Sequence, residues 1–180
     1  AHNNLGITLQ ELGKLEEAVA IYGKTIALKP GLTKAHYNLG LTLKELGKLE
    51  EAETSYRKAI ELKPDYTEAH NNLGITLQEL GKLEEAEASY RKTITLKSDY
   101  TKAYLNLGVL QDENGDILSA IDSCKQAINT NPDFAMCWDN IYYPLQVIKS
   151  KNTSIEDHLP LLDEKVTSKY AQISKSILSY

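Results

Sequence analysis

Cysteine is scarce in this sequence of 180 residues, which contains only Cys124 and Cys137. Two cysteines give no disulfide framework and no spacing that suits a metal site. The simplest interpretation is a pair of buried free thiols in a reducing, cytoplasmic compartment. Long apolar runs are also missing, so the sequence predicts neither a membrane-spanning helix nor a signal peptide. The sequence begins at Ala1 instead of a methionine, and we expect a fragment of a longer protein.

An excess of positive charge is missing too. The 20 Lys and Arg residues are outnumbered by 25 Asp and Glu residues, which gives a formal net charge of −5. A nucleic-acid ligand needs clustered Lys and Arg for its phosphates, so the composition argues against one. Phe and Trp occur once each, whereas there are 11 tyrosines. Most large rings therefore carry a hydroxyl that can face water at a groove or rim.

The sequence does contain a repeat with an offset of 34 residues. Residues 1–18 read AHNNLGITLQELGKLEEA, and residues 69–86 are identical to them. Residues 35–52 read AHYNLGLTLKELGKLEEA, and a weaker copy starts at Ala103. An offset of this length predicts a stack of helix–turn–helix units, each of which packs mainly on its neighbours.

Each unit is predicted to contain two helices. In the second copy, Ala35, Leu39, Leu43 and Leu46 form one apolar stripe of a first helix. Gly47 follows, where a left-handed residue is needed to end that helix. The second helix is expected to begin near residue 49, to stop before a proline, and to bury Ala52, Tyr56, Ala59 and Ile60.

A glycine also lies inside each first helix. Glycine in a helix interior costs about 1 kcal/mol relative to alanine, so its repetition needs a reason. We expect that two helices approach too closely there for a side chain, which is a packing role. These glycines are Gly6, Gly40, Gly74 and Gly108.

This pattern of Leu-Gly, Leu, Gly, Ala, Tyr, Ala and Pro resembles the tetratricopeptide repeat (TPR). The resemblance covers residues 1 to about 134 and implies an all-α, right-handed superhelix, an α-solenoid of about four repeats. The expected repeats are about 1–32, 33–66, 67–100 and 101–134. The sequence departs from the pattern at Thr25, Thr93, Ser98 and Cys124. These departures bear on how tightly the units pack and not on the fold.

The remainder of the chain is expected to be atypical. Residues 135–150 are interpreted as a degenerate fifth repeat helix, because Trp138 matches the pattern while Pro144 interrupts it. Residues 151–180 are interpreted as a loop and a C-terminal amphipathic helix that caps the open end of the array. Two alternatives stay open for the last helix, which are a connector to a downstream domain and a contact surface for a second copy.

The resemblance implies that the first helices line a concave face. A helical wheel places positions such as 37, 38 and 41 on the side opposite Leu39. Each unit has an asparagine there, and a side-chain amide can bind a peptide main chain of any sequence. The row is similar to the asparagine ladder in the TPR arm of the O-linked N-acetylglucosamine transferases. The alternative is that these amides only form hydrogen bonds within the fold.

An aliphatic residue accompanies each asparagine, namely Ile7, Leu41, Ile75 and Val109. These residues either form a strip for apolar side chains or are covered by the neighbouring helix. Together the two rows predict a groove for an extended peptide. A terminal carboxylate is disfavoured as the ligand, because the Lys, Asn and Arg set that would hold it is not reproduced. The candidate groove residues are Asn4, Asn38, Asn72, Asn106, Asn140, Lys34, Tyr37, Leu41, Asn71, Ile75, Lys102 and Val109.

No arrangement of residues predicts catalysis, a cofactor or a bound metal. His2, His36 and His70 recur at one position, but packed helices lie about 8–10 Å apart and equivalent positions are two helices removed. Zinc needs its ligand nitrogens about 2 Å from one ion, so we interpret these histidines as packing residues. Gly6 to Lys14 lacks the spacing of a phosphate loop, and Asp112 to Asp116 lacks the closing Glu of a calcium loop.

The sequence therefore predicts a scaffold for protein–protein interaction that binds an extended segment of a partner. One alternative is a substrate-recruiting arm of a larger enzyme, such as a glycosyl- or sulfotransferase. Another is self-association, as a homo-oligomer, through the open N-terminal face or the last helix. Neither nucleic acid nor a membrane is expected as a partner.

Overall fold

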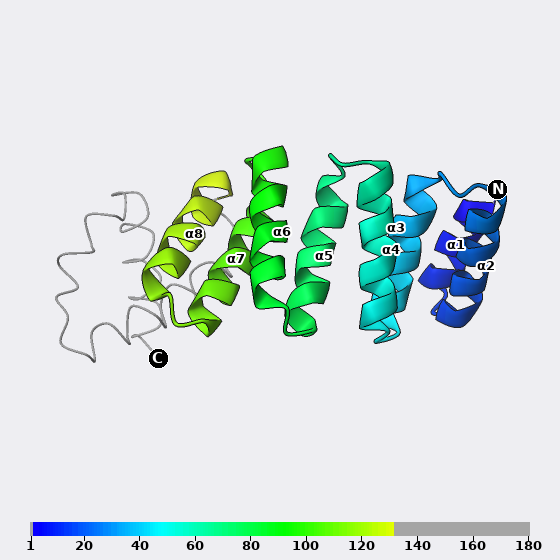
Figure 1. The fold of residues 1–180 in the computed structure, drawn as a ribbon, viewed down its shortest axis with the longest axis horizontal. Coiled ribbons are helices and arrows are strands. Elements are labelled where there is room, and N and C mark those ends of the chain that lie inside the picture. The colour runs from blue at the N-terminus through cyan, green and yellow to red at the C-terminus, as the bar shows by residue number, and fades with distance from the viewer. Residues whose placement is uncertain (1, 132–180) are drawn as a thin grey trace, which may run out of the picture.

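The computed structural model describes residues 2–131, which form eight α-helices arranged as hairpins that follow one another along the molecule (Figure 1). Consecutive helices pair as hairpins, and each hairpin packs on the next. The expected all-α architecture of four helical hairpins is confirmed. The degenerate fifth repeat, the capping helix and Asn140 lie outside the described residues. The helices are α1 His2–Glu11, α2 Leu15–Leu28, α3 Thr33–Glu45, α4 Leu49–Leu62, α5 Thr67–Glu79, α6 Leu83–Leu96, α7 Thr101–Glu113 and α8 Ile117–Thr130.

A glycine ends the first helix of every hairpin. The φ angle of Gly47 is 75°, in the left-handed region that glycine adopts without steric cost. Its amide donates to the carbonyl of Lys44 at 2.9 Å, and the next amide, of Lys48, donates to the carbonyl of Leu43 at 2.8 Å. This pair of bonds satisfies carbonyls that the helix end would leave unpaired. The same turn recurs at Gly13, Gly81 and Gly115.

In the first three hairpins, a tyrosine ring of the second helix lies on a glycine of the first helix. Tyr56 of α4 is fully buried, and a Cβ added to Gly40 of α3 would stand 2.7 Å from its ring. The same contact joins Gly74 and Tyr90 at 2.6 Å. The predicted packing role of these glycines is therefore confirmed, with the specific reason that a side chain of the partner helix occupies the space.

The first and second helices differ in what they touch. Each first helix packs on the first helix of the next hairpin, as α1 on α3, α3 on α5 and α5 on α7. Among the described residues, no second helix packs directly on another second helix. The row is therefore continuous along its first helices and open between its second helices. We call the face formed by α1, α3, α5 and α7 the inner face.

Buried threonine and histidine side chains form hydrogen bonds with backbone carbonyls. Thr25 and Thr93, which stand where the repeat pattern has a small residue, are buried and donate to the carbonyls of Ile21 and Ser89. His36 and His70 are buried, and the ring Nε2 of each lies 2.9 Å from the carbonyl oxygen of Pro30 and Pro64, respectively. The histidines therefore tie the start of a first helix to the loop that precedes it.

Candidate peptide-binding groove

The asparagines of the inner face form a row of hydrogen bonds between repeats, which we call the amide ladder (Asn38, Asn72 and Asn106). The Nδ2 of Asn72 donates to the Tyr37 hydroxyl at 2.9 Å. Asn106 donates to Asn71 at 3.3 Å, and Asn38 donates to Asn3 at 3.4 Å. Each bond spans 35 residues, so each amide joins its own repeat to the preceding one. Each amide nitrogen has a second N–H, because a side-chain amide carries two donors.

Tyr37 and Asn71 accept the hydrogen bonds that join neighbouring repeats. Asn71 is only 3% exposed, so its side chain lies beneath the surface of the groove. Tyr37 is half-buried, and its ring centroid lies 4.8 Å from that of Tyr66 and 6.0 Å from that of Tyr56. Burial, followed by the nearby Tyr66, Tyr100 and Glu68, raises the pKa of Tyr37 to about 12. Its hydroxyl therefore stays protonated at physiological pH and accepts the bond from Asn72.

A second row of bonds crosses the same junctions, which we call the carboxylate ladder (Glu45, Glu79 and Glu113). Gln10 donates to Glu45 at 3.3 Å, Lys44 pairs with Glu79 at 2.9 Å, and Gln78 donates to Glu113 at 2.8 Å. Sequence analysis did not predict this pairing. The signal was present as a glutamate that recurs every 34 residues, just before each turn glycine.

The aliphatic row lies between the two ladders. Ile7 is 38% exposed, whereas Leu41, Ile75 and Val109 are half-buried. Leu41 and Ile75 also pack against the core, so each side chain is shared between core and surface. A hollow of about 430 Å³ opens at the junction of α5 and α7. Its lining brings together three predicted groove residues (Ile75, Asn106 and Val109) with Gln78, Glu79, Tyr90 and Glu113.

The other predicted groove residues lie further from this hollow. Lys34 and Lys102 are exposed in the first turns of α3 and α7, away from the carboxylate ladder at the helix ends. Asn4 is exposed on α1, at the open end of the row. The predicted residues that the structure describes lie on α1, α3, α5 and α7, and of these Ile75, Asn106 and Val109 line this hollow.

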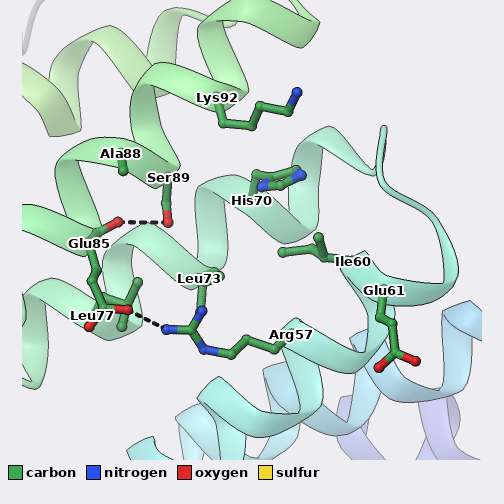
Figure 2. A pocket seen from close by; sticks show the side chains of 10 residues that line it. All are labelled: Arg57, Ile60, Glu61, His70, Leu73, Leu77, Glu85, Ala88, Ser89 and Lys92. Carbon is green, nitrogen blue, oxygen red and sulfur yellow. Dashed lines mark hydrogen bonds and ion pairs between the residues drawn. The ribbon is translucent and has the colours of Figure 1, made fainter.

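A second hollow, which sequence analysis did not predict, lies between α4 and α6 (Figure 2). It measures about 470 Å³, and Leu73 and Leu77 of α5 contribute its apolar lining. Figure 2 shows Arg57 of α4 reaching toward Glu85 of α6, with which it pairs at 2.6 Å. This ion pair bridges two second helices that do not pack on each other.

Glu53 extends that bridge. It is 9% exposed and accepts bonds from Arg57 at 3.0 Å and Lys82 at 2.7 Å. Burial acts to raise the pKa of Glu53, but the two cations outweigh it and hold the pKa below its ordinary value. The carboxylate is therefore ionised at neutral pH and links α4 to the start of α6. In the part of the chain that the structure describes, His, Cys, Asp and Glu side chains nowhere gather in threes that could hold a metal ion, and no helix there is long and apolar enough to cross a membrane.

Comparison with known proteins agrees with the geometry. The family described as "TPR repeat" matches residues 8–47 and 40–81, and "Tetratricopeptide repeat" matches residues 67–100 and 101–134. No curated protein matches the sequence. The match to the family therefore rests on the repeats themselves.

Solved structures share the fold at low sequence identity. A crystal structure of MamA has 22% identity and a TM-score of 0.79, with 97% of each chain covered. PilF of Pseudomonas aeruginosa has 21% identity and a TM-score of 0.75, with 83% of this chain and 68% of that chain covered. The first TPR of Spaghetti (RPAP3), bound to the HSP90 peptide SRMEEVD, has 20% identity and a TM-score of 0.63, with 65% of this chain and 93% of that chain covered. The repeat matches, which run from residue 8 to residue 134, show that the chain belongs to the tetratricopeptide repeat family.

Proposed function

We propose that the inner face binds an extended segment of a partner protein. TPR domains generally mediate protein–protein interactions, and one similar domain is described as bound to a peptide. The observation that supports the proposal most directly is the hollow between α5 and α7. It lies beside Asn106, whose amide uses one donor within the fold and has another for a ligand.

The expected mode is main-chain recognition. An extended peptide presents alternating carbonyls and amides, and its side chains point alternately toward and away from the surface. The amides of Asn38, Asn72 and Asn106 would bind the main chain, while Ile75 and Val109 would contact every other side chain. Affinity in this mode comes from main-chain bonds and selectivity from the side-chain contacts.

The test is a triple change of Asn38, Asn72 and Asn106 to Ala, measured by binding of a genuine partner segment. We expect binding to be lost while circular dichroism still shows a folded helical protein. Each asparagine also joins two repeats, and each lost bond is expected to lower the free energy of unfolding by about 1 kcal/mol. Binding is therefore measured well below the unfolding temperature of the variant.

A matched triple change to Ala at Lys24, Thr95 and Asp122 serves as the control, because these residues are exposed on second helices. The control is expected to bind as the unchanged protein does. If the triple asparagine variant stays folded and binds its partner normally, the amide ladder takes no part in recognition and the proposal fails.

A specific observation also favours self-association as a second candidate function. Leu5 of the first repeat is 46% exposed, whereas Leu73, at the same position of an identical segment, is 4% exposed. The difference arises because α3 and α4 cover the third repeat, whereas no described hairpin precedes the first. Leu12 and Leu28 of the first repeat are exposed as well, at 67% and 69%. Exposed apolar side chains of this kind suit contact with a second protein surface.

A further inference from the structure

The carboxylate ladder changes in charge along the inner face. At the junction of α3 and α5, the Lys44 ammonium neutralises Glu79. At the next junction the equivalent residue is Gln78, which donates an uncharged amide to Glu113. The Tyr90 hydroxyl donates to the Oε1 of Gln78 at 2.9 Å and so fixes which way this amide points. Among the described residues, no Lys or Arg forms an ion pair with Glu113.

This charge lies at the hollow between α5 and α7. Glu79 and Glu113 both line the hollow, together with the partly exposed aliphatic side chains of Ile75 and Val109. Burial is the largest cause of the raised pKa of Tyr90, and the negative charges of Glu79 and Glu113 raise this pKa further. The two carboxylates line the hollow from α5 and α7, and Glu79 is the one already paired with Lys44.

The combination of aliphatic walls and carboxylates matches one kind of side chain. Lysine and arginine carry a long methylene stem that packs on apolar surface and a cation that seeks a carboxylate. Building on the proposed function, we propose that this hollow is the subsite for a lysine or arginine side chain of the bound segment. The stem contacts Ile75 and Val109, and the cation pairs with Glu113.

The chain itself contains a precedent for this contact. Lys44 belongs to the preceding repeat at the position equivalent to Gln78, and its ammonium lies 2.9 Å from Glu79 of the same ladder. At that junction the chain's own lysine supplies the cation, so an incoming basic side chain gains little. At the junction of α5 and α7 that place is held by a neutral amide.

Three peptides test the inference on the full chain. All are short, extended, acetylated and amidated, so that their termini carry no charge, and they differ only in a central lysine, norleucine or glutamate. Norleucine keeps the stem of lysine without its cation. We expect the lysine peptide to bind about fivefold more tightly than the norleucine peptide in calorimetric titrations, and the glutamate peptide to bind most weakly. As the salt concentration is raised, only the affinity advantage of the lysine peptide over the norleucine peptide should shrink, because exposed ion pairs are screened.

Two variants locate the effect. Gln78→Lys copies the residue that the preceding repeat carries at this position, and it should remove the preference for lysine over norleucine. Glu113→Gln should reduce that preference about threefold to fivefold while leaving the norleucine peptide unaffected. Glu84→Gln is the matched control, since Glu84 is exposed on α6 outside the lining of the hollow. Circular dichroism checks that each variant is folded.

The outcomes separate this inference from the proposed function. If the norleucine and lysine peptides bind equally well, the inner face is a peptide groove without a basic subsite, and the inference is overturned. The same conclusion holds if the glutamate peptide binds most tightly, or if Gln78→Lys leaves the preference intact. If none of the peptides binds, the proposed function fails, and the inference fails with it.

Discussion

At the scale of single residues, the contact between a glycine and a tyrosine sets how closely the two helices of a hairpin approach. The Tyr90 ring occupies the space in which a Cβ of residue 74 would lie. The fourth hairpin has Cys124 in place of the tyrosine, and a Cβ on Gly108 would meet its Sγ at 3.0 Å. The ring contact is therefore tighter than the thiol contact, and substitution should cost more in the third hairpin than in the fourth.

We predict that Gly74→Ala lowers the free energy of unfolding by about 1–3 kcal/mol, because overpacking forces the ring or the helix to shift. Gly23→Ala is the control. Gly23 is exposed on α2 with nothing near its missing Cβ, so alanine should raise the free energy of unfolding by about 1 kcal/mol. Urea denaturation measures both. A Gly74→Ala variant as stable as the unchanged protein would contradict the importance of the ring contact.

The residue at position 44 bears on whether another buried tyrosine, Tyr56, has a hydrogen-bond partner. The Tyr56 hydroxyl has no hydrogen-bond partner among the described residues, whereas the equivalent Tyr90 hydroxyl donates to Gln78. Lysine has no acceptor for a hydroxyl, and a buried hydroxyl without a partner is costly. We predict that Lys44→Gln raises the free energy of unfolding by about 1 kcal/mol, as measured by urea denaturation. In a Tyr56→Phe protein the same change should give no gain in stability, because the hydroxyl is absent. A gain that persists in that protein would show that the stabilisation does not come from the Tyr56 hydroxyl.

At the scale of elements, the second helices are joined by charged side chains that span the gap between them. Glu53 and Arg57 of α4 pair with Lys82 and Glu85 at the start of α6. Here α5 separates α4 from α6, and these pairs cross it. The next junction lacks the bridge, since Glu87 pairs only with Arg91 on its own helix, and Ser119 replaces the second carboxylate.

Because the pKa of Glu53 in the folded protein lies below its ordinary value of 4.5, ionised Glu53 contributes stability above that pH. The contribution is lost as the pH falls through the lower pKa of the folded state. We predict that Glu53→Gln lowers the free energy of unfolding at neutral pH by about 1–2 kcal/mol and flattens its decline below pH 4.5. Glu87→Gln should cost less than about 0.5 kcal/mol, as a single exposed pair within a helix does. Chemical denaturation over a pH series measures both, and equal effects of the two changes would contradict the bridge.

At the scale of the whole molecule, the sequence predicted the architecture better than the partners of its side chains. The offset of 34 residues, Gly47 and the buried Tyr56 follow from periodicity and turn chemistry, which act within one hairpin. The bonds of Asn72 to Tyr37 and of Gln78 to Glu113 join different hairpins, and they depend on how far the repeats are rotated against each other. A helical wheel contains no information on that rotation. For the same reason it placed Asn71 on the open face, although the next repeat buries it.

The open end of the row leads to a prediction about assembly. Fully burying a leucine contributes about 1.5–3 kcal/mol, so covering the exposed leucines of the first hairpin is favourable, namely Leu5, Leu12 and Leu28. We predict that the molar mass from light scattering rises with protein concentration, and that changing Leu5 and Leu12 to Lys restores a constant monomer mass. Leu118→Lys is the control, because Leu118 is exposed on α8 at the other end of the described row. A constant monomer mass for the unchanged protein would exclude self-association through the first hairpin.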